Sequence, residues 1–295
     1  MNTRIWVHSD LQLSQPTLAE ATLSRAVDDL LGLRLSFDAV WCLGDALGGK
    51  DIEALEEIAK ISVAQIRRVN APLYYLMGNH ELDAFRKVGV RCFPLHRLVR
   101  EEPGWHAAPL EAFHFTERLG KALIVFLGDH LAEDGDWWSL AGSIQGRAGQ
   151  YPHTAESYRK LRQMMEDHDG PVIIASHYAL PGGQRPSPLL ASLLPLPRNV
   201  SLFLHGHAHI GDTIFNAENP WQRANPISGE TRLQYNISAL ESVRTPGSHS
   251  AILDLVNGVP ERLRIRCHEK QEWVEEFPLT ATPQSGGCTT ASPVG

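Results

Sequence analysis

The first eighty residues alternate between short apolar runs and longer segments with helical spacing, and this alternation limits the possible folds more than any other feature. Strand-like runs with apolar centres occupy residues 4–8, 39–43 and 73–77, whereas residues 17–31 and 51–69 carry apolar side chains three or four positions apart. Strands that are buried on both faces and joined by helical crossovers form parallel sheets. We therefore predict an α/β fold built on a parallel sheet with covered faces.

The later parts of the chain are less regular. Residues 83–120 hold scattered aromatic residues and prolines, which predicts a loop-rich excursion with short strands, and residues 154–168 have the pattern of a polar helix. Strand-like runs recur at 123–127, 172–175, 200–203, 213–215, 232–237, 251–255 and 262–266. The last of these alternates apolar and charged residues, as a half-exposed edge strand would.

A polar group suited to metal binding follows most of these strands. The groups are Asp10, Asp45, Asn79 with His80, His177, and His207 with His209. The carboxyl ends of parallel strands meet at one edge of a sheet, so we expect these side chains to converge. In extended backbone, His207 and His209 would point to the same side and aim at one position. The mixture of oxygen and nitrogen donors suits divalent Mn, Fe, Zn, Co or Ni, and the groups outnumber the ligands of one ion, which predicts two.

Five segments in order resemble the motifs of the calcineurin-like metallophosphoesterases. They are Ser9-Asp10-Leu11-Gln12, Gly44-Asp45, Gly78-Asn79-His80-Glu81, Ser176-His177 and Gly206-His207-Ala208-His209. The resemblance implies a four-layer αββα sandwich, in which two mixed β-sheets are flanked by helices and the strands after residue 209 join the second sheet. We expect one such domain over residues 1–278 and a disordered tail over residues 279–295, which have almost nothing to bury.

The resemblance also implies a role for each motif residue. Asp10, Asp45 and His209 would bind the first metal ion, and Asp45 would bridge to a second ion bound by Asn79, His177 and His207. His80 would face the substrate, where it would hydrogen-bond the phosphate or protonate the leaving oxygen. Asp45 and His80 are thus the predicted catalytic residues, and Asn79 and His80 are predicted to contact the substrate.

Gln12 departs from the family pattern, which places a histidine at this position of the first motif. The amide is neutral and offers a carbonyl oxygen, which is a weaker ligand than imidazole. Three interpretations follow: Gln12 binds the first metal directly, acts through a water, or leaves that metal loosely held. We favour a functional but altered first site, because every other ligand position is filled.

Two residues that follow His177 are predicted substrate contacts. Tyr178 and Arg185 belong to a segment rich in glycine and proline that should overhang the site. An arginine there is able to pair with a phosphate oxygen. The alternative is that Arg185 is a solvated loop residue.

The function that these patterns favour is hydrolysis of a small phosphomonoester or phosphodiester by attack of a metal-bound hydroxide. Two divalent ions lower the pKa of a shared water and bind the phosphate oxygens during an in-line displacement, and we favour manganese. Two alternatives stay open. One is a non-catalytic, metal-poor scaffold or binding protein on the same fold, with Gln12 as the first lost ligand, and the other is a nuclease.

Charge and hydropathy limit the kinds of partner that we expect this protein to bind. The 27 Lys and Arg residues against 34 Asp and Glu residues give a formal net charge of −7, so nucleic acid is an unexpected partner. No apolar run approaches the length of a membrane span and no signal peptide is visible, so we expect no membrane contact and a cytoplasmic location. The four cysteines lack the spacing of a metal site, and the sequence does not indicate an oligomeric state.

Overall fold

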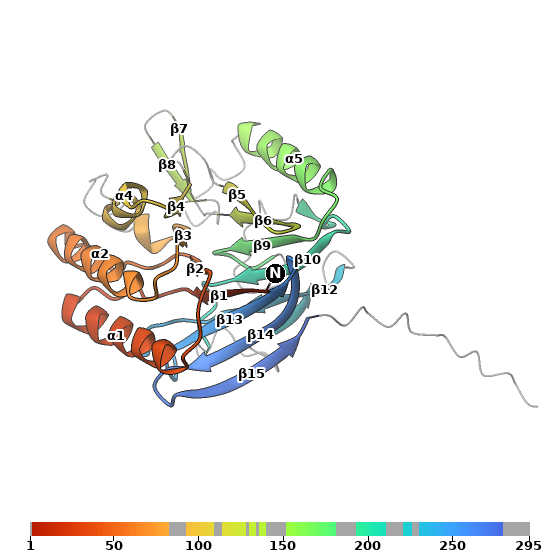
Figure 1. Ribbon diagram of the computed structural model, residues 1–295. Coiled ribbons are helices and arrows are strands. Elements are labelled where there is room, and N and C mark those ends of the chain that lie inside the picture. Colours follow the sequence, from red (N-terminus) through yellow and green to blue (C-terminus); the bar gives the residue numbers. More distant parts are fainter. Residues whose placement is uncertain are drawn as a thin grey trace, which may run out of the picture.

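Two mixed β-sheets with helices on their outer faces make up most of the described chain (Figure 1). The computed structural model describes residues 2–82, 93–108, 114–127, 130–133, 136–139, 152–180, 193–210, 221–225 and 230–279. Within these residues a third, two-stranded ribbon pairs β7 (His130–Glu133) with β8 (Asp136–Ser139).

The first sheet has seven described strands in the order β15-β14-β13-β1-β2-β3-β4. Its parallel half consists of β1 (Asn2–His8), β2 (Ala39–Cys42), β3 (Leu73–Tyr75) and β4 (His106–Ala107). Its antiparallel half consists of β13 (His249–Val256), β14 (Val259–Cys267) and β15 (Glu272–Pro278), with β13 beside β1. The end of the chain thus returns to pair with its beginning. Of the strands after residue 209, which we expected in the second sheet, β13, β14 and β15 therefore belong to the first.

The second sheet has six described strands in the order β11-β12-β10-β9-β6-β5. Four central strands run parallel, namely β6 (Ala122–Leu127), β9 (Val172–Ser176), β10 (Val200–His205) and β12 (Glu230–Asn236). The two edge strands, β5 (His114–Leu119) and β11 (Gln222–Asn225), are antiparallel to their neighbours. Parallel centres with antiparallel edges make both sheets mixed.

Three apolar layers hold the sheets and helices together. Helices α1 (Pro16–Gly32), α2 (Ile52–Arg67) and α4 (Pro94–Glu101) pack on one face of the first sheet, where Trp6 and Val40 are buried among their side chains. Helix α5 (Pro152–Glu166) packs on the outer face of the second sheet. Between the sheets, Ile5 and Trp41 meet Phe126 in the middle layer. The order helix, sheet, sheet, helix confirms the four-layer αββα sandwich (Figure 1).

The middle layer explains why the early strands are apolar without alternation. In β1 the side chain of Trp6 faces the helices, whereas Ile5 and Val7 face the second sheet, and all three are fully buried. Successive strand residues point to opposite faces, so a strand between two layers must be apolar at every position. The crossover helices have local signals too, since Asp51 accepts hydrogen bonds from the N–H groups of Glu53 and Ala54 and so caps α2.

Two sequence expectations about secondary structure were wrong. The short strands expected within residues 83–120 are present as β4 and β5, but the segment also contains a helix, α4, where the prolines suggested loops. Leu95 and Val99 of this helix are buried against the first sheet's helical layer. The alternating strand at 262–266, now β14, is not an edge strand, because β15 pairs along its outer side. Its arginines are tolerated there because Asp254 and Asp29 accept hydrogen bonds from them. The strand expected at 213–215 and the tail from residue 280 lie outside the described residues.

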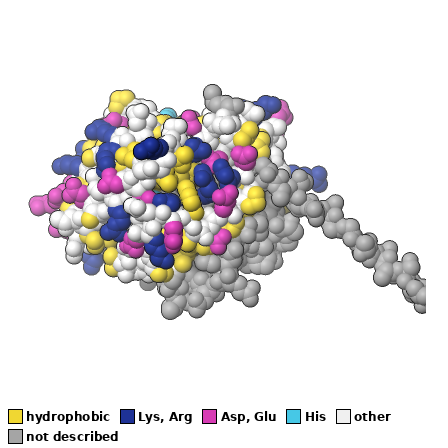
Figure 2. All heavy atoms as spheres, turned by 60° about the horizontal axis from the view of Figure 1, so that its bottom comes forward, with side chains coloured by type: hydrophobic (Ala, Val, Ile, Leu, Met, Phe, Trp, Pro, Cys, Tyr) yellow, Lys and Arg dark blue, Asp and Glu magenta, His cyan; other side chains and the backbone are white. Residues whose placement is uncertain are grey.

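The described surface mixes both signs of charge. On the face shown in Figure 2, acidic and basic side chains are interspersed among apolar ones. Ion pairs between exposed groups, such as Arg25 with Glu269 and Arg97 with Glu56, belong to this surface charge. Among the described residues, every helix is too short or too polar to span a lipid bilayer.

Candidate metal centre

The predicted site residues gather where strands of both sheets end. Loops after β1, β2 and β3 of the first sheet carry Asp10, Asp45 and Asn79, and the segments after β9 and β10 of the second carry His177 and His207. Backbone hydrogen bonds tie the first two loops together, since the Asp10 N–H donates to the Gly44 carbonyl at 3.0 Å and the Gln12 N–H to the Asp45 carbonyl at 3.0 Å. The convergence predicted from the sequence is thus present.

The loops hold their side chains with strained backbone. Asp10, Gln12, Asp45 and His207 all have positive φ values, between 42° and 62°. A non-glycine residue in this left-handed region costs on the order of 1–3 kcal/mol, and such residues cluster at functional sites. Gly206 is required for a different reason, because a Cβ atom there would lie 2.8 Å from Asp10 Oδ2.

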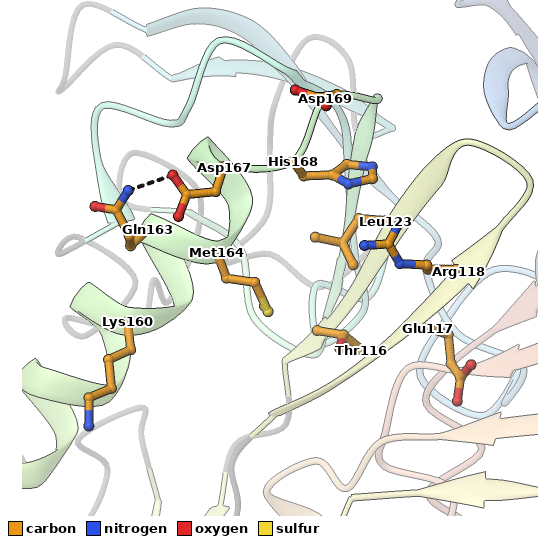
Figure 3. Close-up of a pocket in the computed structure, with 10 residues that line it drawn as sticks. All are labelled: Thr116, Glu117, Arg118, Leu123, Lys160, Gln163, Met164, Asp167, His168 and Asp169. Carbon is orange, nitrogen blue, oxygen red and sulfur yellow. Dashed lines mark hydrogen bonds between the residues drawn. The ribbon is translucent and has the colours of Figure 1, made fainter.

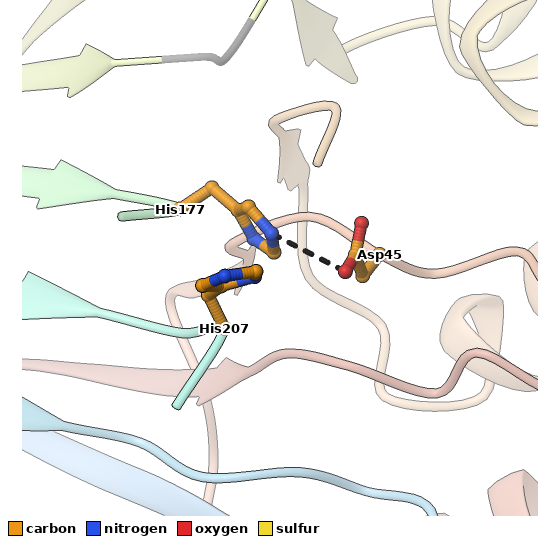
Figure 4. A group of neighbouring side chains, drawn as sticks. All are labelled: Asp45, His177 and His207. Carbon is orange, nitrogen blue, oxygen red and sulfur yellow. Dashed lines mark ion pairs between the residues drawn. The ribbon is translucent and has the colours of Figure 1, made fainter. Parts of the chain in front are cut away.

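Asp45, His177 and His207 form the group best placed to hold a cation (Figure 4). All three are buried, and one ligand atom of each lies within 4.8 Å of those of the other two. Nδ1–H of His177 donates to the Leu43 carbonyl at 2.8 Å, which leaves Nε2 as the ring nitrogen that faces the site. That nitrogen lies 3.3 Å from Asp45 Oδ2.

Asn79 and Tyr178 complete this group. Asn79 Oδ1 lies 3.2 Å from His177 Nε2, and it also accepts a hydrogen bond from the Tyr178 hydroxyl at 3.0 Å. The Tyr178 ring stands 4.5 Å from the ring of His207 and is only 4 % exposed. A carboxylate, an amide oxygen and two imidazoles around one point match the donor set of first-row divalent ions, so these residues fit a metal.

Asp10 and His209 form a second group beside the first. His209 Nε2 lies 3.2 Å from Asp10 Oδ1, and His209 Nδ1 lies 3.1 Å from Glu241 Oε1. The backbone N–H of His207 donates to the other oxygen of Asp10 at 2.8 Å. Burial alone would lower the pKa of His209, but its hydrogen bonds with Asp10 and Glu241 raise that pKa to about 9.

Gln12 lies between the two groups. Its amide nitrogen donates to Asp10 Oδ1 at 2.9 Å and to Asp45 Oδ2 at 2.5 Å. Its amide oxygen accepts a hydrogen bond from the Arg244 guanidinium. Arg244 in turn donates from Nε to Glu241 Oε1 at 3.0 Å.

Both buried aspartates are ionised. Burial opposes ionisation, but the nearby histidines hold the pKa of each carboxyl below its usual range: His209 and His177 act on Asp10, and His177, His80 and His207 on Asp45. Two carboxylates with no solvent exposure concentrate negative charge at one place. Such a site attracts cations.

Glu81 and His80 hold Asp45 in place. The carboxylate of Glu81 accepts hydrogen bonds from four backbone N–H groups, those of Asp45, Ala46, Leu47 and Gly78. Burial and the charge of Asp45 raise the pKa of Glu81 to about 7. His80 begins the short helix η1 (His80–Leu82), and its backbone N–H donates to Asp45 Oδ1 at 2.7 Å.

The structure changes one geometric expectation about the histidines. His207 and His209 do not project from extended backbone, because β10 ends at His205 and His207 has a φ of 62°. Their rings therefore serve different groups, His207 that of Asp45 and His209 that of Asp10. Arg185 lies outside the described residues, and Tyr178 is buried against Asn79 instead of standing on an overhanging loop.

Three residues of the site were missed by sequence reasoning. Glu81 had a signal, since it closes the motif Gly78-Asn79-His80-Glu81. Glu241 and Arg244 had none, because they follow β12 at a distance of more than thirty residues from His209 and belong to no metal-type spacing. Only the packing of the loop after β12 against the loop after β1 brings them in, through hydrogen bonds from Leu240 N–H to Ser9 and from Glu241 N–H to Asp10.

A separate hollow of about 980 Å³ lies between α5 and the β5–β6 hairpin (Figure 3). Its lining includes Lys160 and Gln163 of α5 and Arg118 of β5, and none of the predicted site residues. Asp169, just before β9, also lines it, whereas His177 follows the other end of that strand. The hollow and the metal-binding group are thus at opposite ends of β9.

Comparisons with known proteins define the family. Residues 3–211 match the calcineurin-like phosphoesterase family, and the chain belongs to it. A search of curated proteins finds no match. Among solved structures, the chain is similar to GAP50, the anchor in the inner membrane complex of Plasmodium, with 12% identity and a TM-score of 0.60 over 94% of this chain and 88% of that one. It is also similar to the purple acid phosphatase PPD1 of yellow lupin (Lupinus luteus), with 12% identity and a TM-score of 0.53 over 94% of this chain and 53% of that one.

Proposed function

We propose that this chain is a metal-dependent hydrolase of phosphate esters, with a divalent cation held by Asp45, Asn79, His177 and His207. The observation that carries the proposal is the convergence of three buried donors and the partly buried Asn79 where strands of the two sheets end. Membership of the calcineurin-like phosphoesterase family supports it. The likeness to a plant phosphatase supports the choice of a phosphomonoester as the first substrate to test.

A bound cation would supply Lewis-acid chemistry, since it polarises a phosphoryl oxygen and makes a water acidic near neutral pH. The protein's own part is orientation. The Leu43 carbonyl fixes the ring of His177, the Tyr178 hydroxyl fixes the amide of Asn79, and the His80 N–H fixes one oxygen of Asp45. Partners of this kind, which orient metal ligands, typically change affinity or activity about 10–100-fold when removed.

His80 is the proposed group for the leaving oxygen. It follows Asn79 directly, is partly exposed, and its backbone N–H donates to Asp45 Oδ1. Its imidazole would donate a hydrogen bond or a proton to the ester oxygen as the bond to phosphorus breaks. Tyr178 and Arg185 stay predicted substrate contacts, and Mn²⁺ stays the favoured ion.

The test is hydrolysis of p-nitrophenyl phosphate and bis(p-nitrophenyl) phosphate with added Mn²⁺. We expect turnover by the wild type, a fall of at least about a hundredfold in His177→Ala, and a smaller fall in His80→Ala. His168→Ala is the matched control, since His168 precedes the opposite end of β9 and contacts the Lys121 carbonyl. Equal activity in wild type and His177→Ala would assign any turnover to another site or a contaminant.

A non-catalytic binding protein is the second candidate. The similarity to GAP50, which is described as an anchor, and the replacement of a family histidine by Gln12 favour it. Metal content separates the two candidates. A chain that retains no Mn²⁺ after incubation and desalting supports the binding protein, whereas stable Mn²⁺ binding that Asp45→Asn abolishes supports the hydrolase.

A further inference from the structure

The side chain of Gln12 lies between two buried carboxylates and donates hydrogen bonds to both. Its amide nitrogen donates to Asp10 at 2.9 Å and to Asp45 at 2.5 Å, and neither carboxylate is exposed to solvent. A primary amide carries two N–H groups, so both of its donors are committed to these contacts. The gap that a cation would bridge between Asp10 and Asp45 is thus bridged by hydrogen-bond donors.

The orientation of this amide is fixed by Arg244. The guanidinium donates to the amide oxygen of Gln12 and, through Nε, to Glu241. Turning the amide over would place its oxygen against two carboxylate oxygens and its NH₂ group against a guanidinium. Acceptors would then face acceptors and donors would face donors, so Gln12 does not present an oxygen to a metal at this position.

Arg244 also supplies the positive charge. It reaches the carboxylate pair through the Gln12 amide, and Glu241 anchors both Arg244 and His209 by accepting hydrogen bonds from each. The group around Asp45, Asn79 and His177 differs, because there an imidazole nitrogen, an amide oxygen and a carboxylate oxygen converge. One half of the site therefore leaves its acceptors open to a cation, whereas in the other half the Gln12 amide already donates hydrogen bonds to both carboxylates.

We propose that this chain binds a single divalent cation, at Asp45, Asn79, His177 and His207, and that Gln12 with Arg244 takes the place of a second cation between Asp10 and Asp45. The inference rests on the proposed function and specifies its metal content. Asp10 is then an acceptor for Gln12 and His209 and not a metal ligand. A neutral amide and a half-exposed arginine are weaker electrophiles than a dication, which leaves one ion to carry the Lewis-acid chemistry.

The experiment measures Mn²⁺ stoichiometry on the full chain after loading and desalting, by elemental analysis, together with the electron paramagnetic resonance spectrum of the bound Mn²⁺. We expect one Mn²⁺ per chain and the six-line spectrum of an isolated ion. Gln12→His should raise the ratio to two and give the spectrum of an exchange-coupled pair. Asp10→Asn should retain one Mn²⁺, because Asp10 is not a ligand, and it decides the matter if Gln12→His does not fold.

Gln65→His is the matched control for the added histidine. Gln65 on α2 also accepts a hydrogen bond from an arginine, Arg68, at 2.7 Å, and it should keep a ratio of one. Two Mn²⁺ ions in the wild type would overturn the inference and leave the proposed function intact. No Mn²⁺ in the wild type would overturn both. Loss of the ion in Asp10→Asn, or an unchanged ratio in a folded Gln12→His, would overturn the role given to Gln12 alone.

Discussion

Two buried clusters of carboxylates and histidines lie in different parts of this protein and differ in how their charges are paired. The site cluster comprises Asp10, Asp45, His177, His207 and His209 at the ends of strands. The second, which we name the α1 cluster, comprises Asp29 of α1 with Arg266, His268, Ser250 and Trp6 on the helix-covered side of the first sheet. Both are sheltered from water, yet only the first is arranged for chemistry.

In the α1 cluster every group finds a complementary partner. Asp29 accepts two hydrogen bonds from Arg266, at 2.6 and 2.8 Å, and one from Nδ1–H of His268 at 2.9 Å. Nε2 of His268 then accepts from the Ser250 hydroxyl at 2.7 Å, and Ser250 accepts from the Trp6 indole at 2.9 Å. One carboxylate faces one guanidinium, so the charges balance within the cluster.

The site cluster departs from this balance. Two carboxylates share one Gln12 amide, and the residues that hold them adopt left-handed backbone at Asp10, Gln12, Asp45 and His207. Strain and uncompensated charge are retained where a bound cation repays them. Burial of a His–Asp pair is therefore common to both clusters, whereas an excess of acceptors around one point distinguishes the site cluster.

The largest expected effect is a loss of activity when a carboxylate of the site cluster is replaced. Asp45→Asn should lower phosphate ester hydrolysis by at least a hundredfold or so, because it removes a charge that faces the metal-binding point. The stability of the metal-free chain should stay the same or rise, since a buried carboxylate beside Asp10 is neutralised. Steady-state kinetics and urea unfolding without metal check both parts. A strongly destabilised Asp45→Asn would show that the site cluster is structural.

The α1 cluster should give the opposite result. Asp29→Asn leaves Arg266 buried without its counter-charge, which costs about 3 kcal/mol of unfolding free energy. Activity per folded molecule should be unchanged, because Asp29 lies on α1 and touches no site residue among its described partners. Urea unfolding and active-site-normalised rates measure the two effects. A selective loss of turnover at full stability would contradict the division.

Metal binding should raise the free energy of unfolding only when the site cluster is intact. A cation at a hundred times its dissociation constant adds about 2.7 kcal/mol to the unfolding free energy of a chain that binds it only when folded. Mn²⁺ should therefore raise the melting temperature of wild type and Asp29→Asn alike, and leave that of Asp45→Asn unchanged. Differential scanning fluorimetry with and without EDTA tests this, and a shift in all three would indicate binding elsewhere.

The smallest effect is the pH dependence that the α1 cluster contributes to stability. Burial opposes the charge of Asp29, but hydrogen bonds from Arg266 and His268 lower its pKa to about 2, from an ordinary 3.8. A carboxyl whose pKa is lowered in the folded state stabilises that state when the pH is above the unfolded pKa. This contribution is lost as the pH falls through the folded pKa. The stability gap between wild type and Asp29→Asn should thus be constant above about pH 5 and narrow from pH 4 to pH 2. A gap of undiminished size at pH 2 would contradict the assigned cause.

Much of the fold was readable from the sequence. Strand runs such as 39–43 and 200–203 appear as β2 and β10, and the helices predicted at 17–31 and 51–69 appear as α1 and α2 within a residue or two at most boundaries. The helix α4 and the edge strand β15 were missed. Prolines obscured the first, and β15 has too many charged and exposed residues to resemble a buried strand.

By itself, the sequence determined which residues end the strands and hence which donors lie together where the strands end. The reason is that the direction of a strand decides at which end of the sheet its last residue lies. Only the tertiary structure decided how those donors are divided between the group around Asp45 and the group around Asp10. His207 and His209 turn to different groups, and Glu241 and Arg244 arrive from beyond β12 to hold His209 and Gln12. The physical reason is that the pairing of charges depends on distances of a few ångströms between loops remote in sequence, which no local pattern encodes.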